Sequence, residues 1–175
     1  MDPLVLAGDF AGAYPGEPRI VLEDGRFELR RQGRPPEGLS VAEGLHIVTA
    51  GAGEEAGDGA ADVRARLDAN RDERRDFLVR SARAVETLRS GLEFASQPEI
   101  DGALRALQGA LRDLGVVSDA MDRLLRTAST AGLVATPAGP VAVAATFELA
   151  RARALADAWR AGGSEVREID VGRPG

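Results

Sequence analysis

The sequence predicts an α+β fold, a mostly antiparallel sheet with helices packed on one face, in a single domain over residues 1–175. Three observations predict this class. Short β-rich stretches separated by glycine and proline come first, amphipathic helical patterns follow, and a strand–helix–strand unit closes the chain. With 175 residues, 44% of them hydrophobic, the chain is large enough to bury one core.

The expected strands of the first part are short. The stretches "PLVLAGDF" (3–10) and "RIVLEDGRFELRR" (19–31) are rich in β-forming residues, and the second contains a tight turn at Asp24 and Gly25. "GRPPEG" (33–38) predicts a loop and "GLHIVTA" (44–50) a further strand. The glycine- and acid-rich segment that follows, up to Asp62, has no large apolar side chain and predicts a loop.

The central part is expected to be helical. Apolar residues at three–four spacing predict one continuous helix from Ala61 to about Glu93. "PEIDGALRALQGALRDLG" predicts a second helix that stops at Gly115. Ser118 is placed to cap a third helix, with Asp119 in its first turn.

The last part predicts one strand–helix–strand unit. A Thr-Pro-Ala-Gly turn at 136–139 is followed by a buried strand, "PVAVAAT" (140–146). "FELARARALADAWRAGG" (147–163) predicts a helix closed by two glycines, and "EVREIDV" (165–171) a final edge strand.

Composition excludes several classes of function. The net charge of −6 argues against a general nucleic-acid binder, because attraction to phosphate needs positive surface. All 22 basic residues are arginine, so no lysine can form a Schiff base or contact a phosphate. No cysteine is present, which excludes disulfides, a thiol nucleophile and thiolate metal ligands. The start of the sequence indicates neither a signal peptide nor a membrane span, so we expect a cytoplasmic protein.

Three residues are candidates for acid–base catalysis. His46 is the single histidine, on an expected strand where it faces opposite to Leu45 and Ile47. Asp9 and Tyr14 lie beside glycines, which allow a ligand to approach the backbone closely. Each has an ordinary alternative: His46 as a hydrogen-bonded structural residue, and Asp9 and Tyr14 as parts of turns.

An arginine cluster offers a candidate binding site for an anion. In "RFELRRQGR" (26–34), where position 28 is Glu28, the guanidinium groups of Arg30 and Arg31 could hold a phosphate or carboxylate. The alternative is a solvated sheet edge. "EEAGD" gathers carboxylates, but without histidine, asparagine or a ligand spacing it predicts no metal site.

Taken together, the segments resemble phosphomevalonate kinases of the GHMP superfamily, of the actinobacterial type. "LVLAGDFAGAYPGEPRIVL" is similar to the family's opening strands, and "VTAG", "MDRLLRTASTAG", "TPAG" and "WRAGGSEVREIDV" follow in the family's order. The resemblance implies short N-terminal strands with their junction (1–43), then the ferredoxin-like C-terminal domain of these kinases (44–175). It also makes Thr49, in "VTAG", and Thr136 alternatives for substrate binding.

The phosphate-binding motifs of the family are missing. No "P-x-x-x-G-L-G-S-S-A" stretch, whose amides hold ATP phosphates, lies between the opening strands and the C-terminal half, so most of the ATP-binding domain is expected to be absent. Thr136 stands at the lysine position of the family's third motif and Ala138 at its serine position, and Pro140 lacks an N–H. We therefore expect no ATP-dependent kinase and no cofactor.

Two functions remain open from the sequence. The first is a cofactor-independent isomerase, cyclase or lyase of natural-product or isoprenoid-related metabolism, acting on a small organic metabolite that is phosphorylated or isoprenoid-derived. The second is a non-catalytic pseudokinase that binds or regulates a partner, with a homodimer over the sheet face left uncovered by the missing domain.

Overall fold

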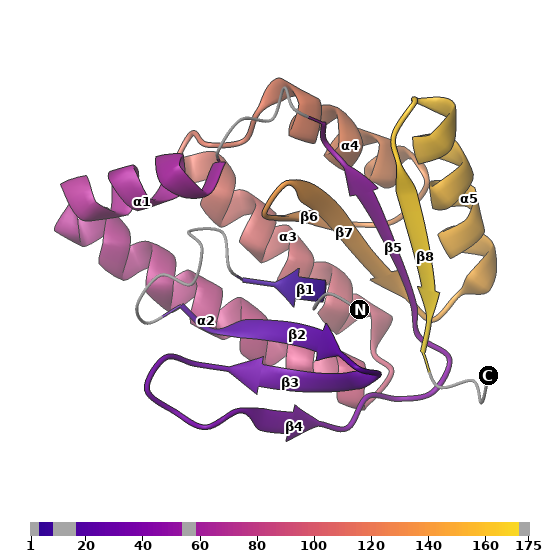
Figure 1. Cartoon of the computed structure of the whole chain (residues 1–175), viewed down its shortest axis with the longest axis horizontal. Helices are drawn as coiled ribbons and strands as arrows, with labels where there is room; N and C mark the ends of the chain where they lie inside the picture. Colours follow the sequence, from indigo (N-terminus) through magenta and orange to yellow (C-terminus); the bar gives the residue numbers. More distant parts are fainter. Residues whose placement is uncertain (1–3, 9–16, 54–58, 172–175) are drawn as a thin grey trace.

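The computed structural model describes residues 4–8, 17–53 and 59–171, which form eight strands and five helices (Figure 1). The α+β class predicted from the sequence is confirmed, with all strand pairs antiparallel. The strands form two four-stranded sheets rather than one.

The first sheet has the order β1-β2-β3-β4, built from β1 (Leu4–Ala7), β2 (Arg19–Glu23), β3 (Arg26–Arg30) and β4 (Glu37–Leu39). The predicted turn at Asp24 and Gly25 is confirmed, with φ of 51° and 75°, values that suit the two-residue hairpin joining β2 and β3. β4 was expected to be loop; its three residues pair only with β3, at the sheet edge.

The second sheet has the order β6-β7-β5-β8, built from β5 (His46–Gly51), β6 (Ala135–Ala138), β7 (Val141–Thr146) and β8 (Val166–Asp170). The prediction of a turn at 136–139 was wrong, because most of this segment is β6. Pro137 is tolerated there since β6 is an edge strand and its missing N–H need not join a second ladder. Gly139 (φ 61°) and Pro140 make the turn into β7.

The helices are α1 (Gly59–Ala69), α2 (Arg71–Glu93), α3 (Gln97–Asp113), α4 (Asp119–Thr130) and α5 (Leu149–Ala161). The helix expected to be continuous from Ala61 is broken at Asn70, whose Oδ1 accepts hydrogen bonds from the N–H groups of Asp72 (3.0 Å) and Glu73 (3.1 Å). This side-chain cap favours a new helix start at Arg71. The predicted cap by Ser118 is confirmed by the bond to its Oγ from the N–H of Met121 (3.1 Å).

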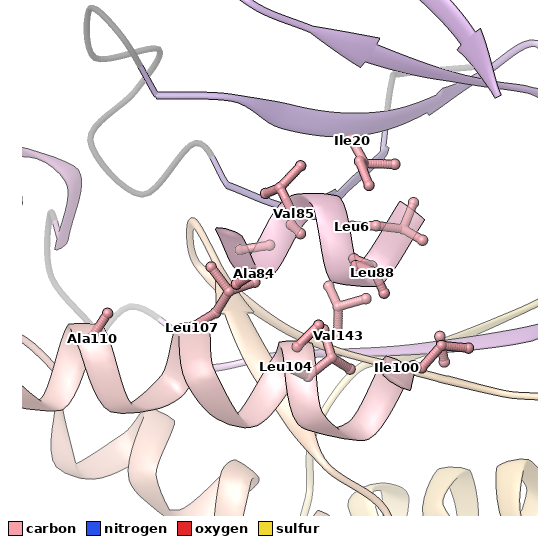
Figure 2. Close-up of a cluster of buried hydrophobic side chains, with 14 of the residues drawn as sticks. Leu6, Ile20, Ala84, Val85, Leu88, Ile100, Leu104, Leu107, Ala110 and Val143 are labelled. Carbon is pink, nitrogen blue, oxygen red and sulfur yellow. The ribbon is translucent and has the colours of Figure 1, made fainter. Parts of the chain in front are cut away.

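The main core lies between the two sheets and is filled by α2 and α3. Figure 2 shows Ile20 of the first sheet above Val85 and Leu88 of α2, with Leu6 beside them and with α3 and Val143 of β7 on the other side. α4 and α5 cover the opposite face of the second sheet and form a separate cluster with it. The helices therefore divide between the two faces of the second sheet, and β5 is buried on both.

The sheet face that was expected to be uncovered is covered by other parts of the same chain, chiefly α2 and α3. Ile47, Val143 and Ala145 on that face belong to the main core. Among the described residues, the large hydrophobic side chains that remain exposed are Val79 and Phe94, both on or next to α2. The homodimer stays a prediction, but the apolar face that motivated it is covered.

Candidate functional site

His46 begins β5 and meets Asp170 at the end of β8. The two residues are direct cross-strand partners, and Nδ1 of His46 lies 2.6 Å from Oδ1 of Asp170. The imidazole is buried, with 7% of the side chain exposed, whereas the Asp170 side chain is 49% exposed. The pair therefore lies where the second sheet reaches the surface.

The hydrogen bond to Asp170 determines which ring nitrogen of His46 carries the proton. A carboxylate only accepts hydrogen bonds, so Nδ1 carries the proton that it donates to Asp170. In the neutral ring the lone pair is then on Nε2, the arrangement that suits a general base held by a carboxylate. We call His46 and Asp170 the dyad. Asp170 was not singled out from the sequence.

The surroundings of the dyad place it on the side of the second sheet that α4 and α5 cover. His46 shares its face of β5 with Val48 and Ala50, which pack against α4 and α5, while Ile47 faces the main core. This confirms the predicted orientation of His46 opposite to Ile47. Its partner on β7 is the buried Thr146, whose Oγ1 accepts a hydrogen bond from the N–H of Glu148 (3.1 Å).

Thr49 and Thr136 lie on the other face of the sheet. Both are direct partners of Val143, on either side of it, so the three side chains form one row facing the main core. Thr136 is fully buried and its Oγ1 has no hydrogen-bond partner; Thr49 is 5% exposed. The structure thus brings the two predicted threonines together but separates them from His46 by the thickness of the sheet.

The predicted arginines are paired with carboxylates of the chain. Arg30 binds Glu23 and Glu28 on the first sheet, and Arg31 binds Glu86 of α2. The hydrogen bonds that Arg30 donates to Glu23 and, to a smaller extent, to Glu28 raise the pKa of Arg30 above its usual value. Because the pKa of Arg30 is raised in the folded state, its pairing stabilises the fold fully below the usual pKa of arginine and is lost only when the pH rises through the raised value. Arg30 therefore stays charged and paired at neutral pH. An anionic ligand would have to displace these partners.

Asp9 and Tyr14, the other two catalytic candidates, lie outside the described residues. Their proposed roles stay predictions. In the part of the chain that the structure describes, no group of three or more histidine, aspartate and glutamate side chains is arranged to hold a metal ion.

The segment that stands at the third motif of the resembled family, with Thr136, Ala138 and Pro140, is a β-hairpin. Ala138 pairs with Val141 across the Gly139–Pro140 turn, and the carbonyl of Pro140 accepts a hydrogen bond from the N–H of Ala52 (3.0 Å). Six residues, 40–45, connect β4 to β5. An anion-binding loop needs a row of free N–H groups, and neither the turn nor this short connection has the glycine-rich form that supplies one.

Known structures identify the fold. The chain is similar to L. major mevalonate kinase (TM-score 0.65, 16% identity, 83% of this chain and 49% of that one) and to Streptococcus pneumoniae phosphomevalonate kinase (TM-score 0.60, 18% identity, 83% and 44%). It is also similar to Cytophaga hutchinsonii homoserine kinase (TM-score 0.54, 19% identity, 83% and 48%). No protein-family model and no curated protein sequence matches the chain.

These neighbours are GHMP-type kinases, so the chain has a GHMP-kinase-like fold, as the sequence resemblance implied. It spans less than half the length of each of them. At these identities the likeness establishes the fold and not the activity. None of the helices in the described ranges combines the length and the apolar character needed to span a bilayer.

Proposed function

We propose that the chain is a cofactor-independent enzyme that performs acid–base chemistry on a small organic metabolite. The observation that carries the proposal is the 2.6 Å contact between His46 Nδ1 and Asp170 Oδ1. It leaves Nε2 as a base whose orientation is fixed by two paired strands. The phosphorylated or isoprenoid-derived substrate and the cytoplasmic location expected from the sequence belong to the same proposal.

The dyad suits isomerisation, cyclisation or elimination. Nε2 takes a proton from an acidic C–H of the substrate, and the imidazolium, stabilised by Asp170, returns that proton, or one exchanged with solvent, to another atom or to a leaving group. Protons are conserved in this cycle and no oxidant or reductant is consumed. Asp9 and Tyr14 are proposed as further acid–base groups.

We propose in addition that the chain does not transfer phosphate from ATP. The absence of lysine and the β6–β7 hairpin at the third-motif position both support this view. A thermal-shift measurement with ATP and Mg²⁺ tests it, and a saturable rise of the melting temperature would contradict it.

The single histidine makes the enzyme proposal directly testable. We would record the imidazole NMR signals of His46 with mevalonate, mevalonate phosphates and prenyl diphosphates, and then incubate each compound that shifts them in D2O. Enzyme-dependent incorporation of deuterium is the expected result. His46→Gln should lower its rate by about 10²–10⁴-fold.

A matched pair of variants on β8 completes the test. Asp170→Asn should also slow the exchange, whereas Glu168→Gln, on the same face of β8 but paired with Arg160, should leave it unchanged. Equal rates in wild type and His46→Gln would overturn the assignment of the base.

A binding or regulatory protein is the second candidate. It is favoured by the burial of His46, which leaves little of the imidazole open to a substrate. A hydrogen-bonded pair at a sheet end can be purely structural. Co-purification of one defined protein partner, with no metabolite shifting the His46 signals, would support this function over the enzyme.

A further inference from the structure

The end of β7 that carries Thr146 extends past its neighbour β6. The pairing of β6 with β7 stops at Ala135 and Ala144, whereas β7 continues to Thr146 and stays paired with β5 over this length. Backbone groups of residues two apart along a strand point to the same side. The carbonyl of Ala145 and the N–H of Phe147 therefore point the same way, and β6 supplies a partner to neither of them.

The side chain of Gln97, the first residue of α3, bonds to both of these groups. Its Nε2 donates to the carbonyl of Ala145 (3.1 Å), and its Oε1 accepts the N–H of Phe147 (3.1 Å). One amide side chain thus satisfies two backbone groups that a neighbouring strand would otherwise satisfy.

The partners of Gln97 fix the orientation of its amide. Nε2 also donates to Oδ1 of Asp101, one turn further along α3 (3.0 Å). A carboxylate and a backbone carbonyl only accept hydrogen bonds, so Nε2 faces Asp101 and Ala145 while Oε1 faces Phe147. Two donors and one acceptor are used together, a combination that a glutamate or a methionine side chain does not offer.

Thr146 lies between the two residues that Gln97 holds, and it is the cross-strand partner of His46. The Oγ1 of Thr146 accepts the N–H of Glu148, the N-cap residue of α5, which makes no side-chain cap hydrogen bond of its own. The end of β7 and the start of α5 are therefore held by side-chain bonds. Since β5 pairs with β7 on one side and with β8 on the other, the position of His46 relative to Asp170 depends on this segment.

We propose that Gln97 is a positioning residue for the dyad. It acts through the backbone on both sides of Thr146, and Thr146 acts on His46 through the pairing of β7 with β5. The effect of Gln97 on turnover rests on the proposed function. Its effect on the hydrogen bond between His46 and Asp170 does not, because that bond is a feature of the fold.

Gln108 offers a matched control on the same helix. Its Nε2 donates to the carbonyl of Ala135 (2.9 Å), at the start of β6. Ala135 lies in the row of Ala144 and Val48, not in the row of His46. Gln108→Met therefore removes a bond of the same kind, from a glutamine of α3 to a strand of the second sheet, without changing the segment that pairs with His46.

The single imidazole of the chain reports the effect without any substrate. We would measure by NMR the solvent-exchange rate of the His46 Nδ1–H, which the bond to Asp170 slows, at equal intervals below the melting temperature of each variant. Gln97→Met should raise this rate about tenfold, the effect of weakening one hydrogen bond, and Gln108→Met should leave it unchanged.

A second variant keeps the test decisive if Gln97→Met does not fold, which circular dichroism would show. Gln97→Glu keeps the shape of the side chain and the acceptor for Phe147, but it loses both donors and places a second carboxylate one turn from Asp101. It should also raise the exchange rate. Wild-type exchange in the folded Gln97 variants, or an equal rise in Gln108→Met, would overturn the proposal.

Deuterium incorporation into the substrate, the assay of the proposed enzyme, gives the catalytic readout. Gln97→Met should lower its rate about tenfold and Gln108→Met should not, because an imidazole that is less firmly held is a poorer base. An unchanged rate in Gln97→Met would also count against the positioning role. If the wild type exchanges no metabolite, the proposed enzyme fails, while the Nδ1–H rates still decide the role of Gln97.

Discussion

His46 and Asp170 are 124 positions apart in the sequence and meet as cross-strand partners of β5 and β8, with Nδ1 2.6 Å from Oδ1. The pair joins the first strand of the second sheet to its last. Because each residue is held by a different strand, the geometry of the imidazole depends on the complete sheet.

The dyad predicts a specific tautomer. We expect the neutral His46 ring to carry its proton on Nδ1, since Asp170 can only accept it. Two-bond ¹H–¹⁵N correlations measure this directly, and the chain gives a single imidazole pattern. Asp170→Ala should change the pattern and Glu168→Gln should not. A proton found on Nε2 in the wild type would contradict the hydrogen bond.

Two of the buried threonines of the second sheet, Thr136 and Thr146, predict effects of opposite sign. Thr136 Oγ1 has no partner, so Thr136→Val removes an unsatisfied hydroxyl and should raise the free energy of unfolding by about 1–3 kcal/mol. Thr146 Oγ1 accepts the N–H of Glu148, so Thr146→Val should lower it by about 1 kcal/mol. Urea unfolding compares the two. A destabilised Thr136→Val would show that its hydroxyl has a partner.

The crossing of α2 and α3 depends on Gly91. A Cβ at this position would lie 2.8 Å from Ile100 Cγ1 and 3.0 Å from its backbone N. Overpacking costs about 1–3 kcal/mol, more than the roughly 1 kcal/mol that alanine gains over glycine in a helix, so Gly91→Ala should destabilise the protein. Gly102→Ala should be neutral or stabilising, because among the described residues no atom lies within 4 Å of a Cβ at this position. Equal melting temperatures of the two variants would contradict the close crossing.

The start of α2 depends on the Asn70 cap. Asn70→Ala removes an acceptor for two backbone N–H groups and should cost about 1 kcal/mol of the free energy of unfolding. Asn70→Asp keeps a side-chain acceptor and should retain the stability. If alanine were as stable as aspartate in urea unfolding, α1 and α2 would form one helix, as the sequence pattern predicts.

Local patterns predicted most of the elements, and long-range pairing explains what they missed. The Asp24–Gly25 turn and the Ser118 cap are encoded within a few residues, so the sequence identifies them. The break at Asn70 was missed because asparagine is also tolerated inside helices, and only its side-chain bonds show the new start. β6 was missed because Pro137 is typical of turns.

The candidate site was harder to predict for the same reason. Strand alternation placed His46 opposite Ile47 correctly, but no local signal pairs β5 with β8, so Asp170 could not be selected. Two of the carboxylate partners, Glu23 for Arg30 and Glu86 of α2 for Arg31, are brought near only by the folded chain. The bonds of Gln97 to β7 and to the residue after it span 48 and 50 positions and have no sequence motif.

The edges of the second sheet limit how another protein could bind. At one edge, β8 presents Arg167 and Glu168, charged side chains that disfavour pairing with an added strand. At the other, Gln108 of α3 donates to the carbonyl of Ala135 (2.9 Å) and occupies an acceptor that β-augmentation would use. A regulatory partner or a second copy of the chain would therefore find both edges of the second sheet obstructed, and we expect its binding not to depend on adding a strand there.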